Sequence, residues 1–132
     1  MKIKMYKRPN GTYGIRNRIA VIPTVACVNH IAQSIAEKIP SADAYTHPYG
    51  CDQLGSDGKL SFDCLKSMGI HPNNGAVLVV GLGCEEIIPN DLYKAIKAQQ
   101  PNTQCIVMQE IGGTTKTVET GVEICRKFEE IL

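Results

Sequence analysis

The stretch Ala76-Val77-Leu78-Val79-Val80 decides the fold that we predict for this chain of 132 residues. An uninterrupted apolar run of this length is typical of a β-strand buried on both faces, as strands of parallel sheets are. The stretch Ile19-Ala20-Val21-Ile22 shows the same pattern, and residues 42–46 and 104–108 are weaker examples. The chain is therefore expected to contain four strands of one parallel sheet.

Helical patterns follow each of these four strands. The first helix is expected to end before Pro40, the second to end at Gly69, and the third to begin at Pro89. Thr114 or Thr115 is expected to cap the last helix. Strands that alternate with helices in this way form right-handed βαβ units. We therefore predict an α/β fold with a four-stranded parallel, doubly wound sheet of the flavodoxin-like or Rossmann-like type.

The segment before the first strand, residues 1–18, is expected to form a β-hairpin or a short extended arm, because Pro9-Asn10-Gly11 is a turn sequence. Residues 19–132 are expected to form a single α/β domain. A positive cluster on the arm has two interpretations. Exposed charge is usually solvated, which favours an arm surrounded by water, and the alternative is a contact to an anionic ligand or a partner domain. The cluster consists of Arg8, Arg16 and Arg18.

The composition argues against several partners and environments. The chain has 14 Lys and Arg residues and 13 Asp and Glu residues, so its net charge of +1 predicts neither a nucleic-acid nor an acidic-membrane partner. No apolar run approaches the roughly 18 residues of a membrane-spanning helix. The sequence shows no signal-peptide pattern, and its six cysteines form no CxxC pair. A cytoplasmic protein with free thiols is therefore expected.

The candidate site is expected at the carboxyl ends of the strands, where open α/β sheets bind their ligands. Four segments follow the four strands, namely residues 23–27, 47–53, 81–86 and 109–114. They contain three of the six cysteines and one of the three histidines. Thiolate, imidazole and carboxylate groups beside glycine-rich turns suit a transition metal or an anionic substrate.

Two glycine-rich loops at this edge each have a structural and a functional interpretation. Gly81-Leu82-Gly83 begins like a dinucleotide-binding loop, but Glu86 stands where the third glycine is required, which argues against nicotinamide binding. The backbone N–H groups of this loop remain candidates for binding an anion. Gly112-Gly113-Thr114 is either a plain turn before a helix or an anion site at a helix N-terminus, with Lys116 adding charge.

The cysteines are expected to differ in role. Cys27 stands at a helix start, where it either is favoured as a thiolate by the helix dipole or packs against the sheet. Cys51 and Cys84 lie in loops and are the candidates for ligands or reactive thiols. The remaining three lie on apolar faces of predicted elements and are expected to be small core residues. These are Cys64, Cys105 and Cys125.

The three histidines are expected in three different places. His47 belongs to the candidate site, and His30 is expected at the surface of the first helix. His71 opens the segment His71-Pro72-Asn73-Asn74, which is expected to be a turn at the opposite edge of the sheet.

Six segments along nearly the whole chain form a series of motifs. They are Gly14-Ile15-Arg16-Asn17, Ile22-Pro23-Thr24-Val25 with Cys27, His47-Pro48-Tyr49-Gly50-Cys51-Asp52-Gln53, His71-Pro72-Asn73, Val79-Val80-Gly81-Leu82-Gly83-Cys84-Glu85 and Gln109-Glu110-Ile111-Gly112-Gly113-Thr114. This series resembles the altronate/galactarate dehydratase family, in the domain that opens its large catalytic region. The large subunit of sulfolactate sulfo-lyase is similar as well.

The resemblance implies a hydro-lyase that dehydrates a sugar acid to a 2-keto-3-deoxy acid. It also implies dependence on a divalent metal, Fe(II) first and Mn(II) as the alternative. If the chain is closer to the sulfo-lyases, the leaving group is sulfite. In both reactions a proton is abstracted next to a carboxylate and a β-substituent leaves, and a divalent cation can stabilise the enolate-like charge.

The resemblance also implies the residues of the site. The metal candidates are His47, Cys51 and Cys84, with Cys27 as a further one. The general base has no candidate here and is expected in another region of the enzyme. The residues expected to bind substrate are Thr24, Gln53, Glu85, Gln109, Gly112, Gly113 and Thr114.

The chain departs from the family in length. Family enzymes carry a larger C-terminal region and often a small β-rich N-terminal module, so this chain is expected to be a fragment whose partners are the remaining domains or subunit. On its own it is expected to be incomplete as an enzyme. A non-catalytic docking or assembly module is the second hypothesis. A stand-alone flavodoxin-like or nucleotide-binding protein is the third, and the missing phosphate-binding fingerprint argues against it.

Overall fold

The computed structural model describes residues 3–46, 56–83 and 89–132, with side chains omitted for residues 56–61. Four strands form one parallel sheet in the order β4-β3-β5-β6. Their bounds are Arg18–Pro23 for β3, Ala42–Ala44 for β4, Asn74–Gly81 for β5 and Thr103–Val107 for β6. The predicted four-stranded parallel sheet is confirmed.

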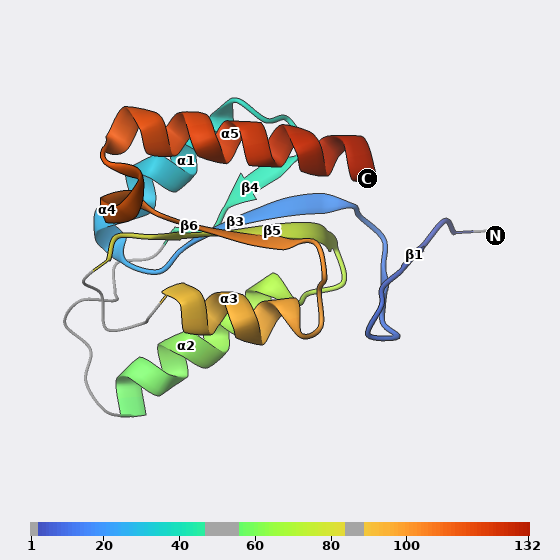
Figure 1. The fold of residues 1–132 in the computed structure, drawn as a ribbon. Coiled ribbons are helices and arrows are strands. Elements are labelled where there is room, and N and C mark those ends of the chain that lie inside the picture. Colours follow the sequence, from blue (N-terminus) through green and yellow to red (C-terminus); the bar gives the residue numbers. More distant parts are fainter. Residues whose placement is uncertain (1–2, 47–55, 84–88) are drawn as a thin grey trace.

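Helices cover both faces of this sheet, which confirms the doubly wound arrangement (Figure 1). The short 3-10 helix Ala26–Val28 leads into α1 (Asn29–Glu37), and α1 packs with α5 (Thr114–Ile131) on one face. The other face is covered by α2 (Ser56–Gly69) and α3 (Pro89–Lys97). A single helical turn, α4 (Met108–Ile111), joins β6 to α5.

The central strand β5 explains why its sequence is uniformly apolar. All eight of its residues are buried, since it pairs with β3 on one side and with β6 on the other. Leu78 and its alternate neighbours pack toward α1 and α5, whereas Val77 and Val79 pack toward α2 and α3. Side chains of a strand point alternately to the two faces, so a strand between two helical layers must be apolar at every position.

The order of the strands places a topological switch point between β3 and β5. After β3 the chain moves outward to β4, and it then crosses to the other side of β3 to form β5 and β6. The crevice at such a point, beyond the carboxyl ends of the strands, is where open α/β sheets bind ligands. The edge of the sheet that the sequence indicated therefore contains this switch point.

The N-terminal arm is a hairpin, as predicted. Its charged side chains are not all surrounded by water, because one of them bonds to the rest of the molecule. Strands β1 (Tyr6–Lys7) and β2 (Tyr13–Gly14) pair antiparallel, and Gly11 in the turn has φ +88°. The guanidinium group of Arg8 donates to the carbonyl of Pro72 (2.7 Å), the side chain of Asn17 (2.9 Å) and the carbonyl of Arg16 (2.8 Å). The arm is thus fastened to the turn before β5.

That turn itself is confirmed. His71 is exposed, and the N–H of Asn74 donates to its carbonyl at 3.0 Å. Gly14 of the hairpin lies directly against the carbonyl of Pro72, where no Cβ would fit. The turn therefore provides the surface on which the arm rests.

Two sequence predictions about the helices are wrong. Cys64 is exposed, because Leu65, one position further along α2, occupies the buried side of the helix. No threonine side chain caps α5, since the N-cap residue is Gly113 and it has no side-chain cap hydrogen bond. The turn α4 was also not expected, because four residues are too few to show a helical period.

The other predictions for cysteine and histidine side chains in the core and on the first helix hold. Cys125 is fully buried among the residues of α1 and α5, and Cys105 is partly buried against the opposite core. His30 is exposed on α1. In the part of the chain that the structure describes, no helix combines the length and apolar character needed to cross a membrane.

The buried thiol of Cys125 predicts a loss of stability in alkali. Burial first, and the nearby charge of Glu129 second, raise its pKa to about 12. An unfolded thiol titrates near 8.5, so above that pH the unfolded chain releases a proton that the folded chain keeps. The contribution of this thiol to the free energy of unfolding is fully present below about pH 8.5. Above that pH it falls by up to ~1.4 kcal/mol per pH unit as the pH rises toward the folded pKa.

Urea unfolding at pH 8 and pH 10 checks this. We expect the fall in the free energy of unfolding between these pH values to be smaller in Cys125→Ala than in the wild type, by up to ~2 kcal/mol. An equal fall in the two proteins would contradict the raised pKa of the Cys125 thiol.

Candidate functional site

The candidate site is the carboxyl edge formed by the ends of β3, β5 and β6, on the side of α4 in Figure 1. In the described part of the chain this edge contains the segments that follow these three strands. Their predicted site residues are Thr24, Cys27, Gln109, Gly112, Gly113 and Thr114. The remaining predicted site residues lie outside the described residues, namely His47, Cys51, Gln53, Cys84 and Glu85.

Thr24 lies inside the edge and holds two strands together. It is fully buried, and its N–H donates to the carbonyl of Val80 at 2.9 Å. Its hydroxyl donates to the same carbonyl at 3.4 Å. Thr24 therefore extends the pairing of β3 with β5 by one residue beyond β3 and fixes where the site begins.

Gly83 and Gln109 bring the loop after β5 against α4. The N–H of Gln109 donates to the carbonyl of Leu82 at 3.1 Å. Gly83 has φ +128°, and a Cβ added there would overlap the side chain of Gln109. The backbone conformation favours a glycine at this position, and any larger residue would also have to displace the side chain of Gln109. The backbone conformation thus explains the glycine at position 83 without a bound nucleotide.

The two glycines before α5 are required by backbone conformation alone. Gly112 has φ +96° and ends α4, with its N–H donating to the carbonyl of Met108 at 3.0 Å. Gly113 has φ +135°, and a Cβ on either glycine would meet no atom within 4 Å. The bend they form points the first turn of the 18-residue helix α5 to the carboxyl edge. Thr114 and Lys116, both exposed, lie in that first turn.

The N-terminus of α5 gives the edge a positive electrostatic character. The first N–H groups of a helix have no partner within the helix, and they carry about half a positive charge from the aligned peptide dipoles. A carboxylate or another oxyanion is the ligand that such a helix end favours.

The predicted metal candidates can be compared with the structure only at Cys27. Cys27 is exposed on the 3-10 helix after β3, so of the two alternatives its packing against the sheet is excluded. Within residues 3–46, 56–83 and 89–132, no group of three or more His, Cys, Asp or Glu side chains is arranged to hold a metal ion.

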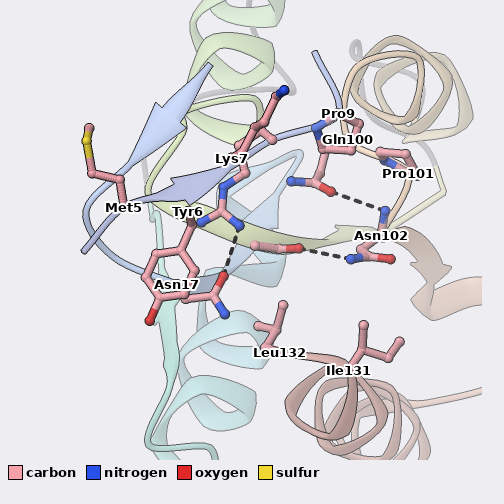
Figure 2. Close-up of a pocket in the computed structure, with 12 residues that line it drawn as sticks. Met5, Tyr6, Lys7, Pro9, Asn17, Gln100, Pro101, Asn102, Ile131 and Leu132 are labelled. Atoms are coloured by element: carbon pink, nitrogen blue, oxygen red, sulfur yellow. Dashed lines mark hydrogen bonds between the residues drawn. The ribbon is translucent and has the colours of Figure 1, made fainter. Parts of the chain in front are cut away.

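A cavity of about 510 Å³ lies at the opposite edge of the sheet, and sequence reasoning missed it. Figure 2 shows Tyr6 and Asn17 on one side of it and Ile131 and Leu132 below. Several of its polar groups already bond one another: the N–H of Asn102 donates to the Gln100 side chain, and Arg8 donates to Asn17. The cavity itself is lined by segments far apart in the chain, from the arm to the C-terminal end of α5, so no local sequence signal could have found it.

Comparison with known proteins adds a family. Residues 5–132 match the family described as "D-galactarate dehydratase/Altronate hydrolase, second domain". The chain is 44% identical over 94 residues to an altronate dehydratase of Escherichia coli (strain K12), covering 64% of the chain and 19% of that protein. It is 34% identical over 138 residues to an altronate dehydratase of Bacillus subtilis (strain 168), covering 96% of the chain and 27% of that protein.

A third relative has a different name. The chain is 42% identical over 77 residues to the (2R)-sulfolactate sulfo-lyase subunit beta of Chromohalobacter salexigens, covering 58% of the chain and 20% of that subunit. The chain thus spans between about a fifth and about a quarter of these relatives. No solved structure matches it.

The contact between Gly83 and Gln109 predicts a specific pattern of stabilities. We expect Gly83→Ala to lower the free energy of unfolding by ~1–3 kcal/mol, because the added methyl group combines a strained φ with overlap of the Gln109 side chain. In a Gln109→Ala background the same substitution should cost less, since only the strain at φ remains.

Gly112→Ala is the matched control, because it has the strained φ without the overlap. Its cost should be the same in both backgrounds when measured by urea unfolding. If Gly83→Ala costs equally with and without the Gln109 side chain, the contact does not exist as described.

Proposed function

Because the chain belongs to the D-galactarate dehydratase/altronate hydrolase family, as its second domain, we propose that it is part of a hydro-lyase that dehydrates a sugar acid of the altronate or galactarate type to a 2-keto-3-deoxy acid. The observation that carries the proposal is the match over residues 5–132, in a fold whose switch point and helix N-terminus share one edge. The altronate dehydratases among the relatives support this substrate class.

In this proposal the carboxyl edge binds the carboxylate of the sugar acid. The N–H groups that follow Gly112 and Gly113, with the dipole of α5 behind them, would hold that carboxylate. This interaction grows stronger in the transition state, because proton abstraction next to the carboxylate spreads negative charge onto its oxygens. Lys116 in the first turn of α5 adds a positive charge, and Gln109 supplies an exposed amide. The general base is assigned to the remaining region of the enzyme.

We further propose a divalent metal, Fe(II) or Mn(II), with His47, Cys51 and Cys84 as its ligands and Cys27 as a further candidate. Thiolate and imidazole donors suit such an ion, and the exposed position of Cys27 at the carboxyl edge leaves its thiol accessible. The described residues on their own do not form a metal site.

A carbon–sulfur lyase is the alternative reaction, supported by the sulfo-lyase subunit among the relatives. Both reactions need a carboxylate-binding edge and a stabilised enolate-like charge, and they differ in the leaving group, water or sulfite. The edge described here serves either, so the leaving group must be discriminated elsewhere in the enzyme. For either reaction we propose a cytoplasmic enzyme.

The arm provides a surface on which the remaining domains or subunit would dock. In the register of the hairpin, Tyr6 faces Gly14 and Lys7 faces Tyr13, so Met5, Tyr13 and Ile15 share its outer side. These three side chains are 50%, 54% and 60% exposed, and Ile3 is 67% exposed. Contiguous exposed apolar side chains of this kind mark an interface.

The charge of the arm indicates what would cover it. Residues 1–18 contain no acidic residue, so a second copy of the same arm would repel it, whereas an apolar surface with an acidic rim would be attracted. We therefore propose that this face contacts another domain or subunit of the dehydratase and not a second copy. A purely non-catalytic docking module would use the same face. The basic residues are Lys2, Lys4, Lys7, Arg8, Arg16 and Arg18.

The metal proposal predicts stoichiometric binding that depends on two cysteines. We expect the anaerobically purified chain to bind one Fe(II) or Mn(II) ion in calorimetry, and Cys51→Ala and Cys84→Ala to lose that binding, because each removes a thiolate ligand. Cys64→Ala is the control, since Cys64 is exposed on α2 and has no proposed role. Absence of binding in the wild type would place the ligands in another region of the enzyme.

The docking proposal predicts that substitutions on the arm matter only in the longer protein. The test joins this chain to the rest of an enzyme by exchanging it for the aligned segment of the Bacillus subtilis altronate dehydratase. In the isolated chain Met5→Asp with Ile15→Asp should change the free energy of unfolding by less than ~1 kcal/mol, because both side chains are exposed. In the chimera the same pair should lower the melting temperature, since two carboxylates would be buried.

Met68→Asp is the control for this experiment, because Met68 is also an exposed apolar residue but lies on α2 and not on the outer side of the hairpin. It should behave alike in the isolated chain and in the chimera. Equal effects of the arm substitutions in the two proteins would contradict the docking face.

A further inference from the structure

A second, smaller cavity lies where the arm, the turn before β5 and the edge strand β4 meet. Its volume is about 310 Å³. Arg16 comes from the end of the arm, Arg18 from the start of β3, and His71 from the turn. Segments 14–17 and 71–73, which both belong to the motif series, meet here and not at the carboxyl edge, so the proposed sugar-acid site does not use them.

Two acceptor side chains of this cavity, Asp43 and Asn73, are already engaged by donors. Both carboxylate oxygens of Asp43 accept hydrogen bonds from Arg18, Oδ2 from Nε and Oδ1 from Nη2, each at 2.9 Å. The hydrogen bond from Arg18, first among the causes, lowers the pKa of Asp43, so this carboxylate stays ionised and paired. The side-chain oxygen of Asn73 accepts the N–H of Ile15 at 3.0 Å.

The donor groups, in contrast, are available. In the described part of the chain the guanidinium group of Arg16 and the hydroxyl of Tyr45 make no hydrogen bond, and Nη1 of Arg18 has no acceptor. His71 accepts the N–H of Asn73 at its Nδ1 (3.1 Å), so in the neutral ring the proton is on Nε2, which is a donor. Arg16, Arg18 and His71 thus bring unused N–H donors to one cavity, and two of the three carry a guanidinium charge, which suits an anion.

The position of Arg16 is fixed before any ligand arrives. Its carbonyl accepts a hydrogen bond from Arg8 (2.8 Å), and the preceding residue, Ile15, is held by Asn73. The backbone that carries Arg16 is therefore held at both this residue and the one before it, which reduces the ordering cost of binding. Met68 and the ring of Tyr45 add apolar surface to the lining, on which the carbon atoms of a ligand could pack.

We propose that this cavity binds the oxyanion group of a small molecule, a carboxylate or a phosphate, between Arg16, Arg18 and His71. The site is separate from the carboxyl edge, since it lies at the amino ends of β3 and β5. It does not depend on the dehydratase proposal. A phosphate ester and a polycarboxylate share the chemistry that these donors recognise, so both are tested.

Calorimetric titration of the full 132-residue chain with inorganic phosphate and, separately, with citrate tests the proposal at low ionic strength. We expect saturable binding of at least one anion, weakened about tenfold or more by Arg16→Gln, because a charge-assisted pair is lost. Arg16→Lys should retain part of the affinity, and Tyr45→Phe, which removes one donor and no charge, should weaken binding a few-fold. The anion that binds more tightly identifies the class of ligand.

Lys94→Gln is the matched control, because Lys94 is an exposed lysine on α3 that lines neither this cavity nor the carboxyl edge. We expect it to leave the affinity for phosphate and citrate unchanged. The proposal is overturned if neither anion binds the wild type, or if Lys94→Gln weakens binding as much as Arg16→Gln does. A sugar acid that still binds Arg16→Gln would leave the carboxyl-edge proposal standing.

Discussion

Burial of the strand β5 on both faces is the constraint on which the rest of this structure depends. The strand pairs with β3 and β6, and its side chains are distributed between two helical layers. Each buried aliphatic side chain contributes ~1.5–3 kcal/mol from the removal of apolar surface from water. Neither layer could form without the strand between them, so the run from Ala76 to Val80 fixes a three-layer fold with parallel strands.

This constraint separates the molecule into two edges with different characters. At the carboxyl edge, glycines with positive φ stand in the loop after β5 and between α4 and α5, and they allow α4 and the start of α5 to come close. The backbone N–H groups at the N-terminus of α5 are the main groups there that can bind a ligand. At the amino edge the chain is instead held by side chains, among them Arg8 and Asn73, which fasten the arm to the turn. One edge is suited to an anionic substrate, and the other combines an apolar docking face with a cluster of arginines.

The sequence predicts the parts of the fold that depend on local patterns. Uniformly apolar runs indicated the parallel strands, and Pro9-Asn10-Gly11 indicated the hairpin, because these signals come from neighbouring residues. The anchoring of Arg8 on Pro72 joins residues 64 positions apart, so no periodicity reports it. Cys64 was misplaced for a related reason, since a helix of modest amphipathicity leaves open which of two adjacent residues faces the core. Only the position of Leu65 against α3 and the sheet decides it.

The sequence predicts where the candidate site lies, but it does not predict which residues contact one another there. The rule that ligands bind beyond the carboxyl ends of parallel strands selects the edge, and there the structure pairs Thr24 with Val80 and brings Gly83 against Gln109. It assigns Thr24 a buried position between β3 and β5, which sequence spacing alone does not distinguish from an exposed one. Five of the predicted site residues lie outside the described parts of the chain, so their contribution remains a proposal.

The central claim is that the carboxyl edge of this sheet binds a sugar acid. It is tested most directly by titrating the 15N-labelled chain with galactarate and following its backbone amide signals by NMR. The account predicts saturable shifts concentrated at residues 24–27, 81–83 and 109–116. Shifts confined to the amino edge, or no shifts in the presence of the required metal, would contradict it.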